Sequence, residues 1–396
     1  MLSKGIFQTM SRNVLVTPAR AFSSNSVTYD FKDLLIDPDV KGQPIYSTYR
    51  LDESQMPMKA TTNKDELMSY LKRMIQMRRT ELESDRLYKA AMIRGFCHLY
   101  DGQEAISEGM EAGLTYDDCI ITAYRDHCTA IARGDTPYRV IAEMVQKRTG
   151  SSGGKGGSMH YYNSKNNFYG GNGIVGAQIP VGAGLAFGLK YQNKKNIAVA
   201  MYGDGAANQG QLFEASNMAA LWKLPIAFVC ENNLYGMGTA NARAAANTNY
   251  YARGDTVPGF KCDAQNVLIV RETMKWTKNF CLEHGPIFIE YLTYRYHGHS
   301  MSDPGITYRT RDEIKHVRDF RDPIALVKHM LIENSWATEK ELKDIEKEIR
   351  KSIEADVEKL LKDPAPGRED LNTFVGLGKH YIRGVTHDLT SHEYSY

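Results

Sequence analysis

Apolar and polar positions change period repeatedly along the chain. Residues 63–95 carry apolar side chains at helical spacing between charged residues, which predicts a long amphipathic helix ending at Gly95. Residues 102–114 predict a second helix, and residues 117–125 a strand with polar chemistry at its carboxyl end. Further on, a helix, strand, helix, strand and strand are predicted over residues 177–192, 196–202, 208–222, 225–233 and 285–298. This alternation predicts an α/β fold with a mainly parallel sheet and helices on both faces.

Between these elements the pattern predicts less regular segments. Residues 29–62 lack clear periodicity and predict an N-terminal arm, and the glycine-rich residues 151–173 predict a long functional loop. The α/β domain is expected over residues 63–330, followed by a C-terminal helical segment and tail over residues 331–396. In that segment Thr338 and Glu341 have capping-box spacing ahead of an apolar stripe, and Pro364 ends the predicted helix.

The first 28 residues differ in composition from the rest of the chain. They carry Lys4, Arg12 and Arg20 with several serines, and no acid precedes Asp30. A basic, serine-rich and acid-poor start is typical of a mitochondrial transit peptide, with a plain basic tail as the alternative. We therefore expect residues 1–28 to be a transit peptide and the mature protein to lie in the mitochondrial matrix.

Composition narrows the classes of partner. The net charge of +2 over 396 residues is too balanced to favour nucleic acid or a membrane surface as a partner. No apolar run is long enough to cross a bilayer. The six cysteines include no C-x-x-C pair, so zinc and redox sites lack support.

The stretch "YGDGAANQGQ" carries the main candidate chemistry. Asp204 lies between two glycines at the end of a predicted strand, and a helix and a second strand lead to Asn233. A right-handed crossover would place both residues at the same sheet edge, beside a helix N-terminus that favours phosphate. A carboxylate, an amide oxygen, a backbone carbonyl and phosphate oxygens suit magnesium. The pattern thus predicts a metal–diphosphate site.

Other motifs give weaker evidence for a binding site. "GNGIVG" over residues 171–176 satisfies G-x-G-x-x-G, but no apolar strand precedes it and no acid follows at the required distance, so a nicotinamide site is disfavoured. His297 and His299 lack a third metal ligand nearby, although a histidine beside a cofactor can move protons near neutral pH. His98 fits a reaction centre or a core histidine equally well.

The G-D-G motif, the helix, the strand and the paired asparagines resemble the thiamine-diphosphate fingerprint. From about residue 31 to 364 the chain is similar to the alpha subunits of the thiamine-dependent 2-oxo acid dehydrogenase family, and within it to the mitochondrial pyruvate dehydrogenase group. That resemblance rests on "GFCHLYDGQEA", "ITAYRDH", "GKGGSMH", "FYGGNGIVGAQ", "ENNLYGMGT" and "YRYHGHSMSDPG". The branched-chain group is the nearest alternative and differs around the histidine–serine loop.

The resemblance implies roles for several residues. Tyr124 and Arg125 bind the diphosphate of thiamine diphosphate, while Asp204, Asn233 and the carbonyl of Tyr235 hold Mg²⁺. The family pattern places Gly205 and Ala206 beside the phosphates. It places Gly173 and Val175 beside the aminopyrimidine ring.

The family's chemistry is carried by the cofactor, which acts as an electron sink during decarboxylation of pyruvate before the acetyl group passes to a lipoyl arm. His98 and His299 line the reaction centre, and His299 also contacts the cofactor. The implied partners are a pyruvate dehydrogenase beta subunit in an α2β2 heterotetramer and the lipoyl-bearing dihydrolipoyl acetyltransferase core. A nonenzymatic regulatory homologue in the alpha position is the alternative from another class.

The same resemblance implies control by a regulatory kinase and phosphatase. Ser300 matches the main inhibitory phosphorylation site, and Thr307 replaces the usual serine of a second, weaker site. Ala240 stands at the third position, where it cannot accept phosphate. Control through a single dominant serine is therefore expected.

Overall fold

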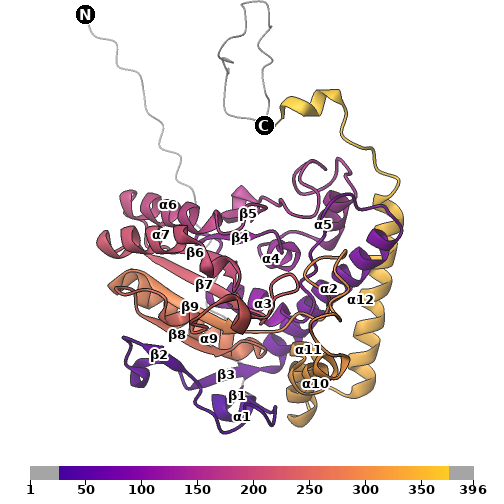
Figure 1. Cartoon of the computed structure of the whole chain (residues 1–396). Helices are drawn as coiled ribbons and strands as arrows, with labels where there is room; N and C mark the ends of the chain where they lie inside the picture. The colour runs from indigo at the N-terminus through magenta and orange to yellow at the C-terminus, as the bar shows by residue number, and fades with distance from the viewer. Residues whose placement is uncertain (1–25, 374–396) are drawn as a thin grey trace, which may run out of the picture.

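The computed structural model describes residues 26–373 (Figure 1). Most of the predicted transit peptide therefore lies outside the described residues, while residues 26–28 belong to strand β1 (Ser26–Asp30). This strand pairs antiparallel with β3 (Lys59–Asn63) in a small two-stranded sheet. Among the described residues, no helix is long and apolar enough to cross a membrane.

The main sheet has seven strands in the order β2-β8-β9-β7-β6-β4-β5. All its neighbours pair in parallel except β2 and β8, which are antiparallel. The strand bounds are Ser47–Tyr49 for β2, Cys119–Ala123 for β4, Phe168–Asn172 for β5, Ala198–Gly203 for β6, Ile226–Asn232 for β7, Gly259–Asp263 for β8 and Ile287–Leu292 for β9. The predicted α/β architecture with a mainly parallel sheet is confirmed.

Helices cover both faces of this sheet, and its central strands are therefore buried on both sides. In β6, Ala198, Ala200 and Tyr202 belong to the core under α6 (Gln178–Tyr191) and α7 (Gly210–Leu221). The alternate residues Val199 and Met201 face the larger core. That core is formed with α2 (Lys64–Lys89), α3 (Glu104–Gly113) and α9 (Val267–His284).

The remaining helices are short or lie at the rim. Their bounds are Phe31–Leu34 for α1, His127–Ala132 for α4, Pro137–Met144 for α5, Asn241–Ala244 for α8, Arg311–Arg321 for α10, Pro323–Glu333 for α11 and Glu339–Leu360 for α12. Helix α12 begins with the predicted capping box of Thr338 and Glu341, and it packs along α2 and α5. Its buried stripe packs α12 against these helices, and Figure 1 shows α12 running along one side of the molecule.

Two predicted boundaries were wrong. Helix α2 ends at Lys89 rather than near Gly95, because the backbone turns into the left-handed region at Ala91, with φ of 57°. Residues 151–173 are not all loop, since Phe168–Asn172 form edge strand β5 beside β4. A Cβ at Gly171 would lie 2.1 Å from the Asp126 carboxylate, so close packing requires glycine at this position. Glycine removes the side-chain alternation by which a strand is recognised in the sequence.

Candidate functional site

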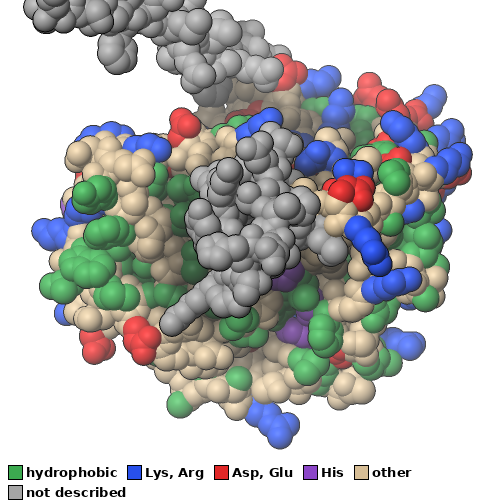
Figure 2. Space-filling view, turned by 90° about the horizontal axis from the view of Figure 1, so that it is seen from above, with side chains coloured by type: hydrophobic (Ala, Val, Ile, Leu, Met, Phe, Trp, Pro, Cys, Tyr) green, Lys and Arg blue, Asp and Glu red, His purple; other side chains and the backbone are tan. Residues whose placement is uncertain are grey.

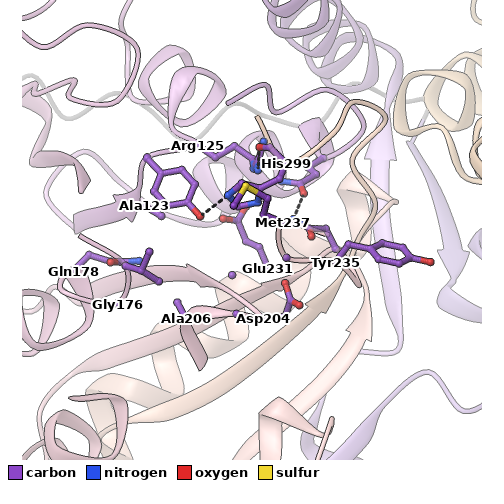
Figure 3. A pocket seen from close by; sticks show the side chains of 17 residues that line it. Ala123, Arg125, Gly176, Gln178, Asp204, Ala206, Glu231, Tyr235, Met237 and His299 are labelled. Atoms are coloured by element: carbon purple, nitrogen blue, oxygen red, sulfur yellow. Dashed lines mark hydrogen bonds between the residues drawn. The ribbon is translucent and has the colours of Figure 1, made fainter. Parts of the chain in front are cut away.

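A cavity of about 300 Å³ lies at the carboxyl ends of β4, β6 and β7. Its position is the one where open parallel sheets bind ligands, outside the strand ends. Figure 3 shows the side chains converging there from several elements. The lining residues are Gln103, Ala123, Tyr124, Arg125, Val175, Gly176, Gln178, Gly203, Asp204, Gly205, Ala206, Glu231, Asn233, Tyr235, Gly236, Met237 and His299.

Asp204 is the acid at the floor of this cavity. It follows β6 directly, and the parallel register of Gly203 with Glu231 brings it beside the end of β7. The residue is only 3% exposed, and its Oδ2 atom has no hydrogen-bond partner among the described residues. Burial raises the pKa of this carboxyl group, while the guanidinium of Arg295 opposes the rise. A buried, unpartnered carboxylate oxygen is costly unless a cation or donor binds there.

Asn233 and Tyr235 add neutral oxygens to the same cavity. The Asn233 amide is fixed from two sides, because its Nδ2 donates to Gln103 Oε1 at 2.9 Å and its Oδ1 accepts from Arg295 at 2.7 Å. The Tyr235 phenol points away from the cavity and donates to Glu313 at 3.0 Å, leaving the backbone of Tyr235 at the wall (Figure 3). One carboxylate, one amide and one carbonyl oxygen make a donor set that suits Mg²⁺.

Tyr124, Arg125 and His299 form the opposite side of the site. The Tyr124 hydroxyl lies 3.3 Å from His299 Nε2. Arg125 donates to the backbone carbonyl of His299 at 2.8 Å and to that of Leu99. This buried guanidinium therefore anchors the histidine loop and also presents positive charge to the cavity, where an anion would be stabilised.

The two predicted catalytic histidines lie together. His98 and His299 have ring centroids 5.4 Å apart, and the His98 ring lies 4.2 Å from that of Tyr124. Burial and the nearby Arg125 lower the pKa of His299 to about 3, and the same causes lower that of His98 to about 2. Both imidazoles are therefore neutral at physiological pH, and each can accept a hydrogen bond at one ring nitrogen and donate one from the other.

Besides Arg125, one carboxylate and a second guanidinium hold the loop that carries His299. Asp303 accepts from the His299 and Gly305 amides at 2.7 and 2.9 Å. Arg309 donates to the backbone carbonyls of four loop residues: Arg295, Tyr296, His297 and Gly305. Ser300 is only 3% exposed, and its hydroxyl lies 2.9 Å from that of Ser302. Thr307 is exposed.

Two predicted site residues do not line the cavity. His98 lies behind Tyr124 and His299, and Gly173 lies on the exposed chain before Val175, with the His160 ring 3.7 Å from where its Cβ would be. His297, considered as a metal ligand, instead has its Nδ1 2.8 Å from Asp101 Oδ2. The remaining predicted cofactor and metal residues all line the cavity.

Sequence reasoning missed three polar residues of the wall. Gln103 and Gln178 are fully buried, and within residues 26–373 each has one amide atom without a hydrogen-bond partner, Nε2 in Gln103 and Oε1 in Gln178. Glu231 accepts from the Tyr100 hydroxyl, and burial raises the pKa of Glu231 to about 7 although Tyr100 and Arg125 oppose the rise. Gln103 stands in "DGQEA" and Glu231 precedes the paired asparagines, so their neighbourhood was the available signal.

Comparison with known proteins decides the family. The family model described as "Dehydrogenase E1 component" matches residues 72–369. The chain belongs to the dehydrogenase E1 component family. It is similar to the pyruvate dehydrogenase E1 component subunit alpha, mitochondrial, of Pisum sativum, with 57% identity over 82% of this chain and 80% of the relative.

Two further relatives align with a larger share of this chain. The alpha-1 subunit of the Oryza sativa subsp. japonica enzyme is 51% identical over 93% of both chains. The somatic alpha subunit from Bos taurus is 48% identical over 93% of this chain and 90% of the relative. The E1 family depends on thiamine diphosphate, and the cavity of this member fits that group. Its buried arginine, unpartnered carboxylate oxygen and glycine-lined strand ends match a diphosphate with its counter-ion.

Proposed function

We propose that this chain is the alpha subunit of a mitochondrial-matrix pyruvate dehydrogenase component, which decarboxylates pyruvate oxidatively and acetylates lipoyl groups for acetyl-CoA formation. The observation that carries the proposal is one cavity uniting the three oxygen donors with Tyr124, Arg125 and His299, in an E1 family member. The names of the relatives give the substrate. They do not favour a branched-chain substrate or a nonenzymatic homologue.

In this proposal Asp204, Asn233 and the Tyr235 carbonyl would hold Mg²⁺, and Tyr124 with Arg125 would face the diphosphate. Gly205 and Ala206 would offer backbone beside the phosphates, since a Cβ at Gly205 would meet nothing within 4 Å. Gly173 and Val175 would flank the aminopyrimidine ring. When bound, thiamine diphosphate supplies the nucleophilic carbon and the electron sink for decarboxylation.

The residues of this chain would orient the reactants. His299 Nε2 lies at the cavity wall beside the Tyr124 hydroxyl, so it can form a hydrogen bond with a group bound there. His98 packs behind this pair and fixes the ring of Tyr124. The low pKa values keep both imidazoles uncharged, which avoids repulsion with Arg125.

A partner chain is expected on the outer face of α6 and α7. Apolar side chains are exposed there, among them Tyr191 at 81% and Leu221 at 74%, and Figure 2 shows apolar groups gathered on the side of these helices. A Cβ at Gly184 or Gly188 of α6 would meet nothing within 4 Å, so another helix could approach closely. Large exposed apolar patches usually mark interfaces. The face continues from the cavity rim at Val175, which suits a beta subunit that completes the active site in an α2β2 assembly.

The proposed partners beyond the beta subunit follow from the reaction. The lipoyl-bearing dihydrolipoyl acetyltransferase core would receive the acetyl group, and a kinase and a phosphatase would act on the histidine loop. The same assembly distinguishes the alternatives, because a nonenzymatic homologue would bind partners without turning over any 2-oxo acid.

Turnover is expected only with the beta subunit. Coexpressed with its cognate beta chain, the protein should decarboxylate pyruvate with a kcat/KM at least about tenfold above that for branched-chain 2-oxo acids, because larger side chains must be excluded from the site. The purified alpha chain alone should be inactive. A preference for the branched-chain acids, or activity without a partner, would refute the assignment.

Loss of the carboxylate at the strand end should remove metal and cofactor together. In the assembled protein Asp204→Ala leaves the diphosphate without its divalent counter-ion, so calorimetry should detect binding of neither Mg²⁺ nor thiamine diphosphate at concentrations that saturate the wild type. Asp319→Ala, which removes an exposed acid on α10, is the control. Undiminished cofactor binding in Asp204→Ala rejects the metal assignment.

A charge placed on the α6 face should block assembly. Val181 is half-exposed, so Val181→Glu leaves the isolated fold intact but buries an unpaired carboxylate against the partner, weakening association about 100-fold. Ser352→Glu on the exposed side of α12 makes the same charge change elsewhere. Light scattering during gel filtration measures the species. If Val181→Glu still forms a full-size heterotetramer, the beta subunit binds another face. If the variant loses only the contacts between alpha subunits, this face binds a second copy of this chain.

Phosphorylation of Ser300 should inactivate the assembled enzyme. A phosphate adds about −1.5 to −2 charges at neutral pH. It cannot fit where the hydroxyl is buried, and it would lie near the Asp303 carboxylate that holds the loop, so the loop should open. After treatment with the family's kinase, Ser300→Ala should keep its activity on pyruvate, whereas Thr307→Ala should be inactivated like the wild type. Inactivation of Ser300→Ala to the wild-type extent would exclude Ser300 as the controlling site.

A further inference from the structure

Arg295 contacts two of the three oxygens assigned above to the metal. Its Nη1 donates to Asn233 Oδ1 at 2.7 Å and also to the Tyr235 carbonyl. Its Nη2 donates to the Gly236 carbonyl at 3.2 Å and to the Tyr308 hydroxyl at 3.1 Å. The side chain is fully buried. One planar guanidinium thus spans the turn that follows β7.

The guanidinium approaches these oxygens from behind the cavity. Asn233 and Tyr235 line the cavity, whereas Arg295 is not among its lining residues. An amide or carbonyl oxygen has two lone pairs, so a hydrogen bond from Arg295 to each leaves the other lone pair for a ligand in the cavity. The contact from Asn233 Nδ2 to Gln103 completes the restraint, because it prevents the amide from turning its nitrogen toward the metal position.

The charge of Arg295 has a second consequence. Arg295 and Arg125 are two buried cations at this site, and the pKa of Arg295 is lowered first by burial and then by the nearby charge of Arg125. A divalent cation entering alone would face both of them, with Asp204 and Glu231 as the carboxyl groups of the cavity, and burial raises the pKa of Glu231 to about 7. The positive charge therefore exceeds the negative charge, and the repulsion would be strong in a buried site. The diphosphate carries the missing negative charge.

We propose that Arg295 is a positioning residue that sets the oxygens of Asn233 and Tyr235 for the divalent cation, and that its charge makes the cation bind together with the diphosphate rather than alone. This inference rests on the proposed function. It assigns to Arg295 the orientation of the metal ligands and the coupling between two bound groups, and no contact with the reacting atoms.

Mn²⁺ is the probe, because electron paramagnetic resonance counts free Mn²⁺ directly without turnover. The assembled protein is titrated with Mn²⁺ in the presence and absence of thiamine diphosphate, and the ratio of the two affinities is the coupling. Arg295→Met removes both the planar guanidinium and its charge. The affinity for Mn²⁺ in the presence of thiamine diphosphate should therefore fall about 10- to 100-fold, while the affinity in its absence should not fall. The coupling should therefore decrease by at least about tenfold.

Two further variants separate geometry from charge. Arg295→Lys keeps the charge but cannot bridge two oxygens from a planar fork, so affinity with cofactor should fall while Mn²⁺ alone remains excluded. Tyr308→Phe removes one acceptor of the guanidinium and should give a smaller loss in the same direction. It also tests the inference if Arg295→Met fails to fold.

Arg133→Met is the matched control, since Arg133 is a fully buried arginine that pairs with Glu111 outside the cavity. It should lower the melting temperature and leave the coupling unchanged. Wild-type coupling in Arg295→Met and Tyr308→Phe, or an equal loss in Arg133→Met, would overturn the inference. Absence of Mn²⁺ binding by the wild type with thiamine diphosphate would instead reject the proposed function.

Discussion

The site depends on the parallel pairing of β6 with β7. Gly203 lies opposite Glu231 in this register, so the residues that follow the two strands emerge side by side. Asp204 and Asn233 are 29 positions apart in the sequence, yet they line one cavity because both strands run in the same direction. A parallel pair requires a crossover, and α7 supplies it while its N-terminal turn points at the same edge.

Around this floor, arginines perform three different tasks. Arg125 lies at the cavity wall, Arg295 holds the turn after β7 from behind, and Arg309 fixes the histidine loop through backbone carbonyls. Each is nearly or fully buried. A planar fork with several donors can satisfy many carbonyls at once, which suits loops that lack secondary structure of their own. This arrangement concentrates positive charge around the cavity, and a bound anion would compensate that charge.

Much of the fold was predictable because its signals are local. The alternation of buried strands with helices, the capping box at Thr338 and the turn glycines around Asp204 depend on neighbouring residues. Strand β5 was missed because Phe168–Asn172 is short, lies at an edge and is rich in glycine. Gly171 is required by the close approach of Asp126 and Met159, and Gly170 by that of Tyr161 and Tyr162, so contacts outside the strand select both glycines. The contribution of β2 to the main sheet was missed for a similar reason, since its three residues pair only with β8.

The sequence by itself determined the alternation of β4, β6, β7 and β9 with α6 and α7, the G-D-G turn, the paired asparagines and the histidine–serine loop, because each is a continuous stretch with its own spacing. Only the tertiary structure decided how these stretches meet. It placed His98 behind the cavity wall, turned the Tyr235 phenol toward Glu313, and added Gln103, Glu231 and Arg295 to the site. Apart from the motifs that surround Gln103 and Glu231, nothing local marks the roles of Gln103, Glu231 and Arg295. These roles arise from contacts across more than 50 positions of sequence, made when the sheet and its crossing loops pack.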